Sequence, residues 1–331
     1  MVRLEQWLGY VHKGIEKRFE ALPLADACRL AGRVSGDSTV AYAWSCAQAI
    51  EAISDAEAPP RAAWLRALAL ERERIANHLG DLGYLGNDCG FAFGLAQFSR
   101  LKEDVLRTNH AAFGHRLAMD FVVPGGVAVD VSPDAAIAMR DESLRLEREI
   151  AVLRDIYDEH SGLQDRVRNC GIVTPALAAK LGLPGLAGRA SGLVRDLRRD
   201  LPVTPYADLE VRVASRSDGD VAARVAVRFD ETLESLRLVR AIVDAMPAGE
   251  IRGNIAEPPA FRLGLGYVEG WRGPVFVALE SGPDGSVRRC HPHDPSWSAW
   301  PVLEHAVIGN IVPDFPLINK SFNLSYSGHD L

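Results

Sequence analysis

Two polar segments, one near each end of the chain, hold the residues best suited to chemistry. The first spans residues 35–42 and includes Asp37 and Tyr42, and the second spans residues 325–331 and includes His329. Their hydroxyl, carboxylate and imidazole groups are types that bind hard metal ions or transfer protons. The sequence has no H-x-x-x-H motif, no paired C-x-x-C motif and no carboxylate cluster at ligand spacing. We therefore expect ionisable groups there without a metal ion.

Simple structural roles are also open for both segments. Ser35 and Ser38 could form a turn and an N-cap before a helix over residues 39–52, because serine is a favoured N-cap residue. Residues 325–331 could form a frayed polar tail, which is common at chain ends. The capping role and a chemical role are compatible with each other.

The framing of the two segments resembles the two C-x-x-C motifs of nickel-iron hydrogenase large subunits, which jointly hold the metal pair. The four matching positions are Ser35, Ser38, Ser325 and Gly328. A serine hydroxyl stays protonated near neutral pH, whereas nickel and low-valent iron are held there by soft thiolates. The resemblance therefore implies vestigial ligand positions, no nickel-iron centre and no metal bound by this chain.

Further segments resemble, in the same order, energy-converting hydrogenases of the hydrogenase-3/4 type and the 49 kDa (D) subunit of respiratory complex I. The collinear segments are YVHKGIEK (10–17), RERIANHLGDLG (72–83), FVVPGGV (121–127), RASGLVRDLR (189–198), MPAG (246–249) and EGWRG (269–273). Residues 300–321 also match, which favours a tail threaded back into the core beside Ser35 and Ser38 over a frayed one.

The fold implied is α+β and predominantly α, a hydrogenase large-subunit-like bundle of long helices with small peripheral β-hairpins or a small sheet. We expect one domain over residues 1–331, without the amino-terminal β-hairpin of the family. Apolar spacing predicts a helix from Pro59-Pro60 to Leu82, and Ser132 before Pro133 predicts another that reaches Tyr157. A third helix is expected over residues 229–246.

Two short strands are expected from apolar patterns, over residues 209–213 and 275–279, the second closed by a turn at 282–285. Residues 290–293 read Cys-His-Pro-His and look metal-like, because residues two apart on a strand share a face. The proline and the preceding hairpin favour an exposed turn instead.

Five residues are candidates for proton or quinone chemistry: Asp88, Asp37, Tyr42, Glu16 and Arg272. The resemblance aligns Asp88 with the complex I aspartate behind the quinone head group, whose histidine partner has no counterpart here. A buried Asp88 without that partner would have a raised pKa suited to a proton relay, whereas the alternative is that it caps the following helix.

Glu16 follows the segment shared with both families, and the alternative is a plain surface or ion-paired residue. Arg272 would approach the metal in a hydrogenase, and here an ion pair with Asp37 or Glu269 is expected.

Composition excludes several classes of protein. The net charge of −7 argues against nucleic acid as a partner. No apolar run is long enough for a spanning helix, no export signal is present, and five scattered cysteines indicate reduced thiols. Gly264-Leu265-Gly266 lacks the third glycine of a dinucleotide fingerprint, and no C-x-x-C could hold an iron-sulfur cluster.

The resemblance implies a subunit of a membrane-associated, redox-driven ion-translocating complex related to NADH:quinone oxidoreductase and energy-converting hydrogenase. It would lie in the cytoplasm, peripherally on the inner face of the membrane, and would not be catalytic alone. The implied partners are an iron-sulfur small subunit that carries the clusters, a 30 kDa-like subunit and antiporter-like membrane subunits, with quinone as a possible acceptor. The alternative is a catalytically inert assembly subunit that keeps the fold.

Overall fold

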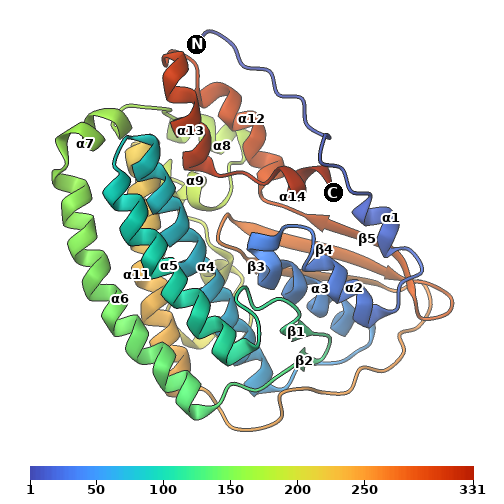
Figure 1. The fold of residues 1–331 in the computed structure, drawn as a ribbon. Coiled ribbons are helices and arrows are strands. Elements are labelled where there is room, and N and C mark those ends of the chain that lie inside the picture. The colour runs from blue at the N-terminus through green and yellow to red at the C-terminus, as the bar shows by residue number, and fades with distance from the viewer.

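The computed structural model describes residues 1–331 as a bundle of long helices beside a small antiparallel sheet (Figure 1). The long helices of the bundle are α4 (Pro60–Asp88), α5 (Ala92–Phe113), α6 (Pro133–Glu159) and α11 (Val221–Ala245). The elements before them are α1 (Ile15–Phe19), α2 (Leu24–Ala31), η1 (Gly36–Ser38) and α3 (Thr39–Ile53). A hairpin of β1 (Val122–Val123) and β2 (Gly126–Val127) joins α5 to α6.

Shorter elements complete the chain. Between α6 and α11 lie α7 (Ser161–Val167), α8 (Pro175–Leu181), α9 (Gly185–Ala190), α10 (Leu197–Asp200) and η2 (Tyr206–Asp208). After α11 come β3 (Leu263–Glu269), β4 (Pro274–Ser281), β5 (Val287–His293), α12 (Ser296–Ala306), η3 (Val312–Asp314), α13 (Phe315–Phe322) and α14 (Tyr326–Asp330). The predominantly α, α+β fold expected from the sequence is confirmed.

Helix α4 is the centre of the bundle. It packs on α5 and α11, and it also contacts α3 and α13. The expected apolar stripe is buried at Leu68, Ile75 and Leu82, yet nearly all the charged side chains between these positions are buried as well. One continuous hydrophobic cluster links the bundle to the sheet. The charges on α4 must therefore find partners on neighbouring elements.

The predicted starts of two helices are explained by caps. Ser132 caps α6 by accepting a hydrogen bond from the amide of Ala135 at 3.2 Å, as expected. Helix α11 begins before the expected residue 229, because Asp220 accepts from the amide of Ala223 at 2.8 Å. Its end before Pro247 agrees with the prediction, since proline cannot continue the helix.

The sheet has the order β3-β4-β5 with antiparallel neighbours throughout. The expected strand over residues 275–279 is confirmed within β4. The expected strand over residues 209–213 is wrong, because no neighbouring strand pairs with this segment and the amide of Arg212 donates instead to Glu234 on α11.

The exposed turn expected at residues 290–293 is also wrong, because these residues form the end of β5. Cys290 and Pro292 are buried, and Pro292 is tolerated because β5 is an edge strand. No group of three or more His, Cys, Asp or Glu side chains is arranged to hold a metal ion, and all five cysteines are free thiols. None of the helices combines the length and apolar character needed to span a bilayer.

Helix α3 lies against β3 at a distance that only glycine allows. A Cβ atom on Gly266 would lie 1.8 Å from the carbonyl oxygen of Ser45, and one on Gly264 would lie 2.1 Å from that of Ala49. The two glycines therefore serve helix-to-strand packing, which agrees with the expectation that Gly264-Leu265-Gly266 is not a dinucleotide fingerprint.

We expect Gly266→Ala to lower the free energy of unfolding by about 2–3 kcal/mol, because α3 and β3 must move apart. Gly36→Ala is the matched control, since a Cβ atom there would have no atom within 4 Å. Denaturant titration of both variants checks this, and equal stability of the two would contradict it.

Candidate functional site

The two polar end segments meet in the structure. The hydroxyl oxygens of Ser35 and Ser325 lie 3.1 Å apart, although 290 positions separate them. Ser325 caps α14 by accepting from the amide of Gly328 at 2.8 Å, so residues 325–331 form an ordered, threaded tail as expected. We call Ser35, Ser38 and Ser325 the serine cluster.

Neither serine of η1 caps a helix with its side chain, so that expectation is wrong. Ser35 Oγ donates instead to Asp37 Oδ1 at 2.8 Å. The hydroxyl oxygen of Ser38 accepts from the indole Nε1 of Trp271 at 3.1 Å. The serine cluster therefore faces Asp37 and the loop after β3.

The Asp37–Arg272 ion pair lies next to the serine cluster, and the expected pairing is confirmed. Arg272 Nη1 lies 2.9 Å from Asp37 Oδ1, and Nη2 lies 2.5 Å from Oδ2. Burial would raise the pKa of Asp37, but the Arg272 guanidinium and the serine hydroxyls outweigh it and lower that pKa to about 2. Asp37 is therefore ionised at neutral pH.

A second buried pair lies in the same region. The phenol of Tyr42, on the first turn of α3, donates to Asp294 Oδ2 at 2.5 Å. Burial, and then the charge of Asp294, raise the pKa of Tyr42 well above its usual range, so the phenol keeps its proton. Asp294 also accepts from the amide of Ser296 at 2.8 Å, which fixes its orientation at the start of α12.

The residues at the vestigial positions do not fit a nickel-iron centre. Three of them offer protonated hydroxyl groups that are already hydrogen-bonded, and soft metals require thiolates. Gly328 has no side chain, and a Cβ atom there would lie 2.3 Å from Asp294 Oδ2. Two hollows border Asp37 and Arg272, with volumes of about 10 and 20 Å³.

Glu73 replaces the missing serine cap of α3. This carboxylate comes from α4 and accepts from the amides of Val40 and Ala41 at 2.7 and 3.3 Å. It lines the hollow of about 20 Å³ together with Asp37 and Lys102, and no ion pair reaches it. Burial raises the pKa of Glu73 to about 8, so at neutral pH it carries a proton.

Two of the five candidate residues lie outside this region. Glu16 is half exposed on α1, where it pairs with His291 Nδ1 at 2.5 Å, in agreement with the alternative of an ion-paired surface residue. Asp88 is exposed at the last turn of α4, so the expectation of a buried carboxylate is wrong. Helix α5 has Phe91 as its N-cap position, so Asp88 does not cap it either. Partial burial raises the pKa of Asp88, and its role in proton transfer stays a prediction.

Sequence reasoning missed Asp294, Glu73 and Trp271. Trp271 stood directly beside the candidate Arg272, and Glu73 lay inside a segment already matched to the family. Asp294 follows the Cys-His-Pro-His run that was interpreted as a turn. Only the packing of α3, α4 and α12 brings the three residues together.

We expect the free energy of unfolding to fall as pH rises from about 5 to 8, because folded Glu73 keeps a proton that the unfolded carboxyl group releases above its ordinary pKa. One such proton changes that free energy by about 1.4 kcal/mol per pH unit. Glu73→Gln should remove this contribution while keeping an oxygen for the α3 amides. Denaturant titrations across this pH range measure the slope, and an unchanged slope in the variant would show that Glu73 is ionised when folded.

Comparisons with known proteins identify relatives of the whole chain. Formate hydrogenlyase subunit 5 of Escherichia coli is 30% identical over 98% of this chain, which spans 57% of that protein. The (D) subunit of the NADH-quinone oxidoreductase from Salinibacter ruber is 27% identical over 96% of this chain and 76% of its own length.

The same fold occurs in a solved structure. A chain from the membrane-bound sulfane sulfur reductase, an archaeal respiratory membrane complex, matches all of this chain and 91% of its own length with a TM-score of 0.94. The sequence identity is 23%, so this likeness concerns the fold. The model of the respiratory-chain NADH dehydrogenase 49 kDa subunit matches residues 88–261, more than half of the chain. The chain therefore belongs to the family of the 49 kDa subunit of respiratory-chain NADH dehydrogenase.

Proposed function

We propose that this chain is a metal-free, hydrogenase-like subunit of a membrane-associated redox complex, in which it couples electron arrival at an iron-sulfur partner to proton or conformational movement. The observation that carries the proposal is the Asp37–Arg272 pair beside the serine cluster. Ionised and protonated groups occupy the region where family members with thiolates hold a metal. A subunit kept only for its shape would favour apolar filling there, since buried polar groups are costly.

The chemistry available at this region is proton transfer and electrostatic response. Asp37 is ionised, Tyr42 and Glu73 carry protons, and Arg272 supplies a fixed positive charge. An electron that arrives on a neighbouring cluster changes the local potential, and such a change moves protons between groups of unlike pKa. No step needs a nickel-iron centre, which the donor set does not fit.

The relatives support the kind of assembly. Their names describe a subunit of formate hydrogenlyase and a subunit of NADH-quinone oxidoreductase. By analogy we propose an iron-sulfur small subunit as electron donor, a 30 kDa-like subunit and antiporter-like membrane subunits as partners. Quinone is the acceptor we propose to test first. The chain would sit peripherally on the inner face of the cytoplasmic membrane.

One observation favours the alternative of a catalytically inert assembly subunit. The hydroxyl groups of the serine cluster satisfy one another and Asp37, and the adjoining hollows are too small for a quinone head group. In that case the polar region would stabilise the junction of the two chain ends and nothing more. Turnover of the assembled complex separates the two functions.

A pull-down of the tagged chain from membranes of its native host, in mild detergent with mass spectrometry, tests the assembly. We expect an iron-sulfur subunit and antiporter-like membrane proteins to co-purify. Recovery of the chain alone would overturn the proposed membership in a complex.

Arg272→Gln should lower electron transfer from the co-purified iron-sulfur subunit to a quinone analogue by about tenfold or more, because Asp37 loses its counter-charge. Assembly should survive, and pull-down of the variant checks that. Arg148→Gln is the matched control, since Arg148 is exposed on α6 and pairs with no carboxylate. Unchanged turnover in an intact Arg272→Gln complex would leave only the assembly role.

A further inference from the structure

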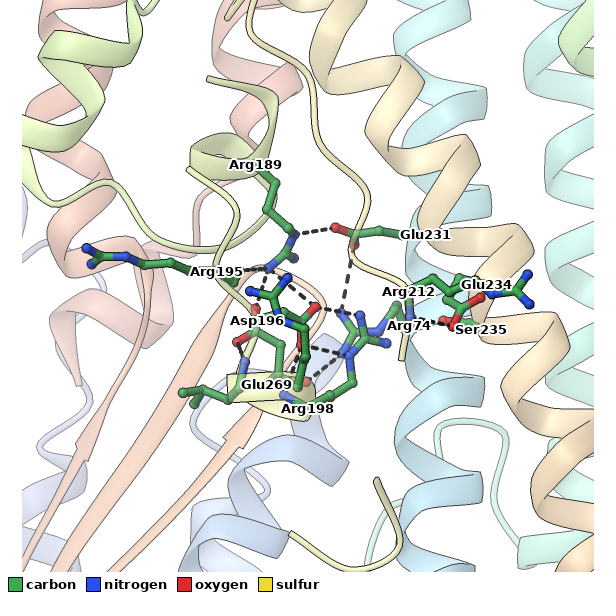
Figure 2. A network of polar contacts seen from close by, with 12 residues as sticks. Arg74, Arg189, Arg195, Asp196, Arg198, Arg212, Glu231, Glu234, Ser235 and Glu269 are labelled. Atoms are coloured by element: carbon green, nitrogen blue, oxygen red, sulfur yellow. Dashed lines mark hydrogen bonds and ion pairs between the residues drawn. The ribbon is translucent and has the colours of Figure 1, made fainter. Parts of the chain in front are cut away.

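Eight buried residues form a closed ionic cluster at the junction of α4, α9, α10, α11 and β3, and Figure 2 shows its core. We call it the buried ionic cluster: Glu71, Arg74, His78, Arg189, Asp196, Arg198, Glu231 and Glu269. Each side chain is at most 2% exposed, and no member forms an ion pair with a residue outside the cluster. Solvent and outside charges therefore do little to balance it.

The cluster contains more acids than permanent cations. It has three guanidinium groups, four carboxyl groups and one imidazole. If every carboxyl group were ionised and the imidazole neutral, the cluster would hold an uncompensated negative charge away from water. Such a charge is costly in a protein interior, and the usual response is the uptake of a proton. One proton must therefore reside on His78 or on one of the carboxyl groups.

The surroundings of His78 leave it neutral. Its Nε2 lies 2.8 Å from Glu231 Oε2 and serves as the donor, while Nδ1 is buried without a hydrogen-bond partner. A protonated imidazole has two N–H groups, so Nδ1–H would be an unsatisfied buried donor. Burial lowers the pKa of His78, in agreement with this assignment. The proton therefore belongs on a carboxyl group.

Two of the carboxyl groups are well compensated at close range. Glu71 accepts hydrogen bonds from Arg198, Tyr206 and Ser235. Asp196 accepts from the Nε, Nη2 and backbone amide of Arg198. These donors stabilise the ionised form of both groups.

Glu231 and Glu269 compete for a single guanidinium. Arg189 donates through Nε to Glu231 Oε1 and through Nη1 to Glu269 Oε1, both at 2.7 Å. Glu231 also accepts from His78, and Arg74 lies 3.9 Å away. Glu269 has only the backbone amide of Leu197 in addition, at 3.1 Å. Glu269 is therefore the least compensated acid.

The charges around Glu269 agree with this ranking. Burial, and next the charge of Asp196, raise the pKa of Glu269, whereas Arg189 and the other partners of Glu231 outweigh burial there and lower its pKa well below the usual range. The titratable groups facing Glu269 come from every element around it: Arg189 on α9, Asp196 and Arg198 at α10, Glu71, Arg74 and His78 on α4, Glu231 on α11, and Tyr206 on η2.

The cluster is joined to the serine cluster by a short segment of chain. Arg74 donates to the carbonyl oxygens of Glu269 and Gly270 at 2.6 and 2.9 Å. The next two residues, Trp271 and Arg272, donate to the backbone and side chain of Asp37. A change of charge on Glu269 thus acts on a segment that is held at both ends.

We propose that the buried ionic cluster is a proton-binding site that holds one exchangeable proton on Glu269, and that residues 269–272 couple this proton to the Asp37–Arg272 pair. The site is separate from the serine cluster and does not depend on any redox partner. Its test therefore uses the full chain alone, and its outcome is independent of the assembly experiment.

The test compares the pH dependence of unfolding in Glu269→Gln and in the wild-type chain, from about pH 5 upward. Folded Glu269 keeps a proton that the unfolded chain releases, so wild-type stability should fall with pH. We expect the unfolding constant of the wild type to rise about tenfold per pH unit more steeply than that of the variant. Contributions from histidines are the same in both chains and cancel in this difference. Equal slopes in a folded variant would overturn the proposal.

Glu142→Gln is the matched control, because Glu142 is a buried carboxylate in a one-to-one pair with Arg72 at 2.7 Å. This variant should unfold more easily and keep the wild-type slope. A change of slope as large as that of Glu269→Gln would mean that the effect is not specific to the cluster, and would overturn the proposal.

A second measurement leaves the cluster intact in case Glu269→Gln does not fold. Glu73→Gln removes the other protonated carboxyl group, so its infrared spectrum near pH 6 should keep one C=O stretch that is typical of a protonated acid and shifts in heavy water. Its unfolding constant should also retain a slope of about one proton. Absence of both signals in folded Glu73→Gln would overturn the proposal.

Discussion

The structure depends on one constraint, which is that the charges of α4 are buried and must be paired. Within this helix Arg66, Glu71, Arg72, Arg74 and His78 are all shielded from water. A buried charge without a partner would shift its pKa or unfold the helix, so each one specifies a neighbour. The partners come from five different parts of the chain: Glu51 on α3, Glu142 on α6, Arg198 on α10, Glu231 on α11 and the carbonyl groups after β3. Pairing thereby fixes how the bundle meets the sheet.

The same constraint organises the region of the vestigial ligands. With thiolates and a metal replaced by hydroxyl groups, the fixed charges that remain are Asp37 and Arg272, and they neutralise one another. Glu73, which has no cation of its own, is held by the amino end of α3 and keeps a proton. Loss of the ligands has thus left a compact set of ionised and protonated groups. This set and the buried ionic cluster are two charge-balanced regions connected through Glu269 to Arg272.

The long helices could be read from the sequence because their signals are local. The apolar stripe of α4 and the Ser132-Pro133 start of α6 depend on residues within a few turns of each other. The segment at 209–213 has the alternating pattern of a strand, yet a strand also needs a neighbour, and none lies beside it. Residues 290–293 failed for the opposite reason, since β4 supplied a partner that made a proline-containing run into an edge strand.

By itself the sequence determined the family, the long helices and the loss of the metal ligands, because motifs, helical periodicity and residue types are all properties of short stretches. It also placed Asp37 beside Arg272, since the matched framing brought the two segments together. Only the tertiary structure decided that Asp88 is exposed, that Glu73 caps α3 and that four carboxyl groups share three guanidinium groups. Burial and charge balance are sums over residues that are distant in the chain, and only the packed fold brings those residues within range of one another.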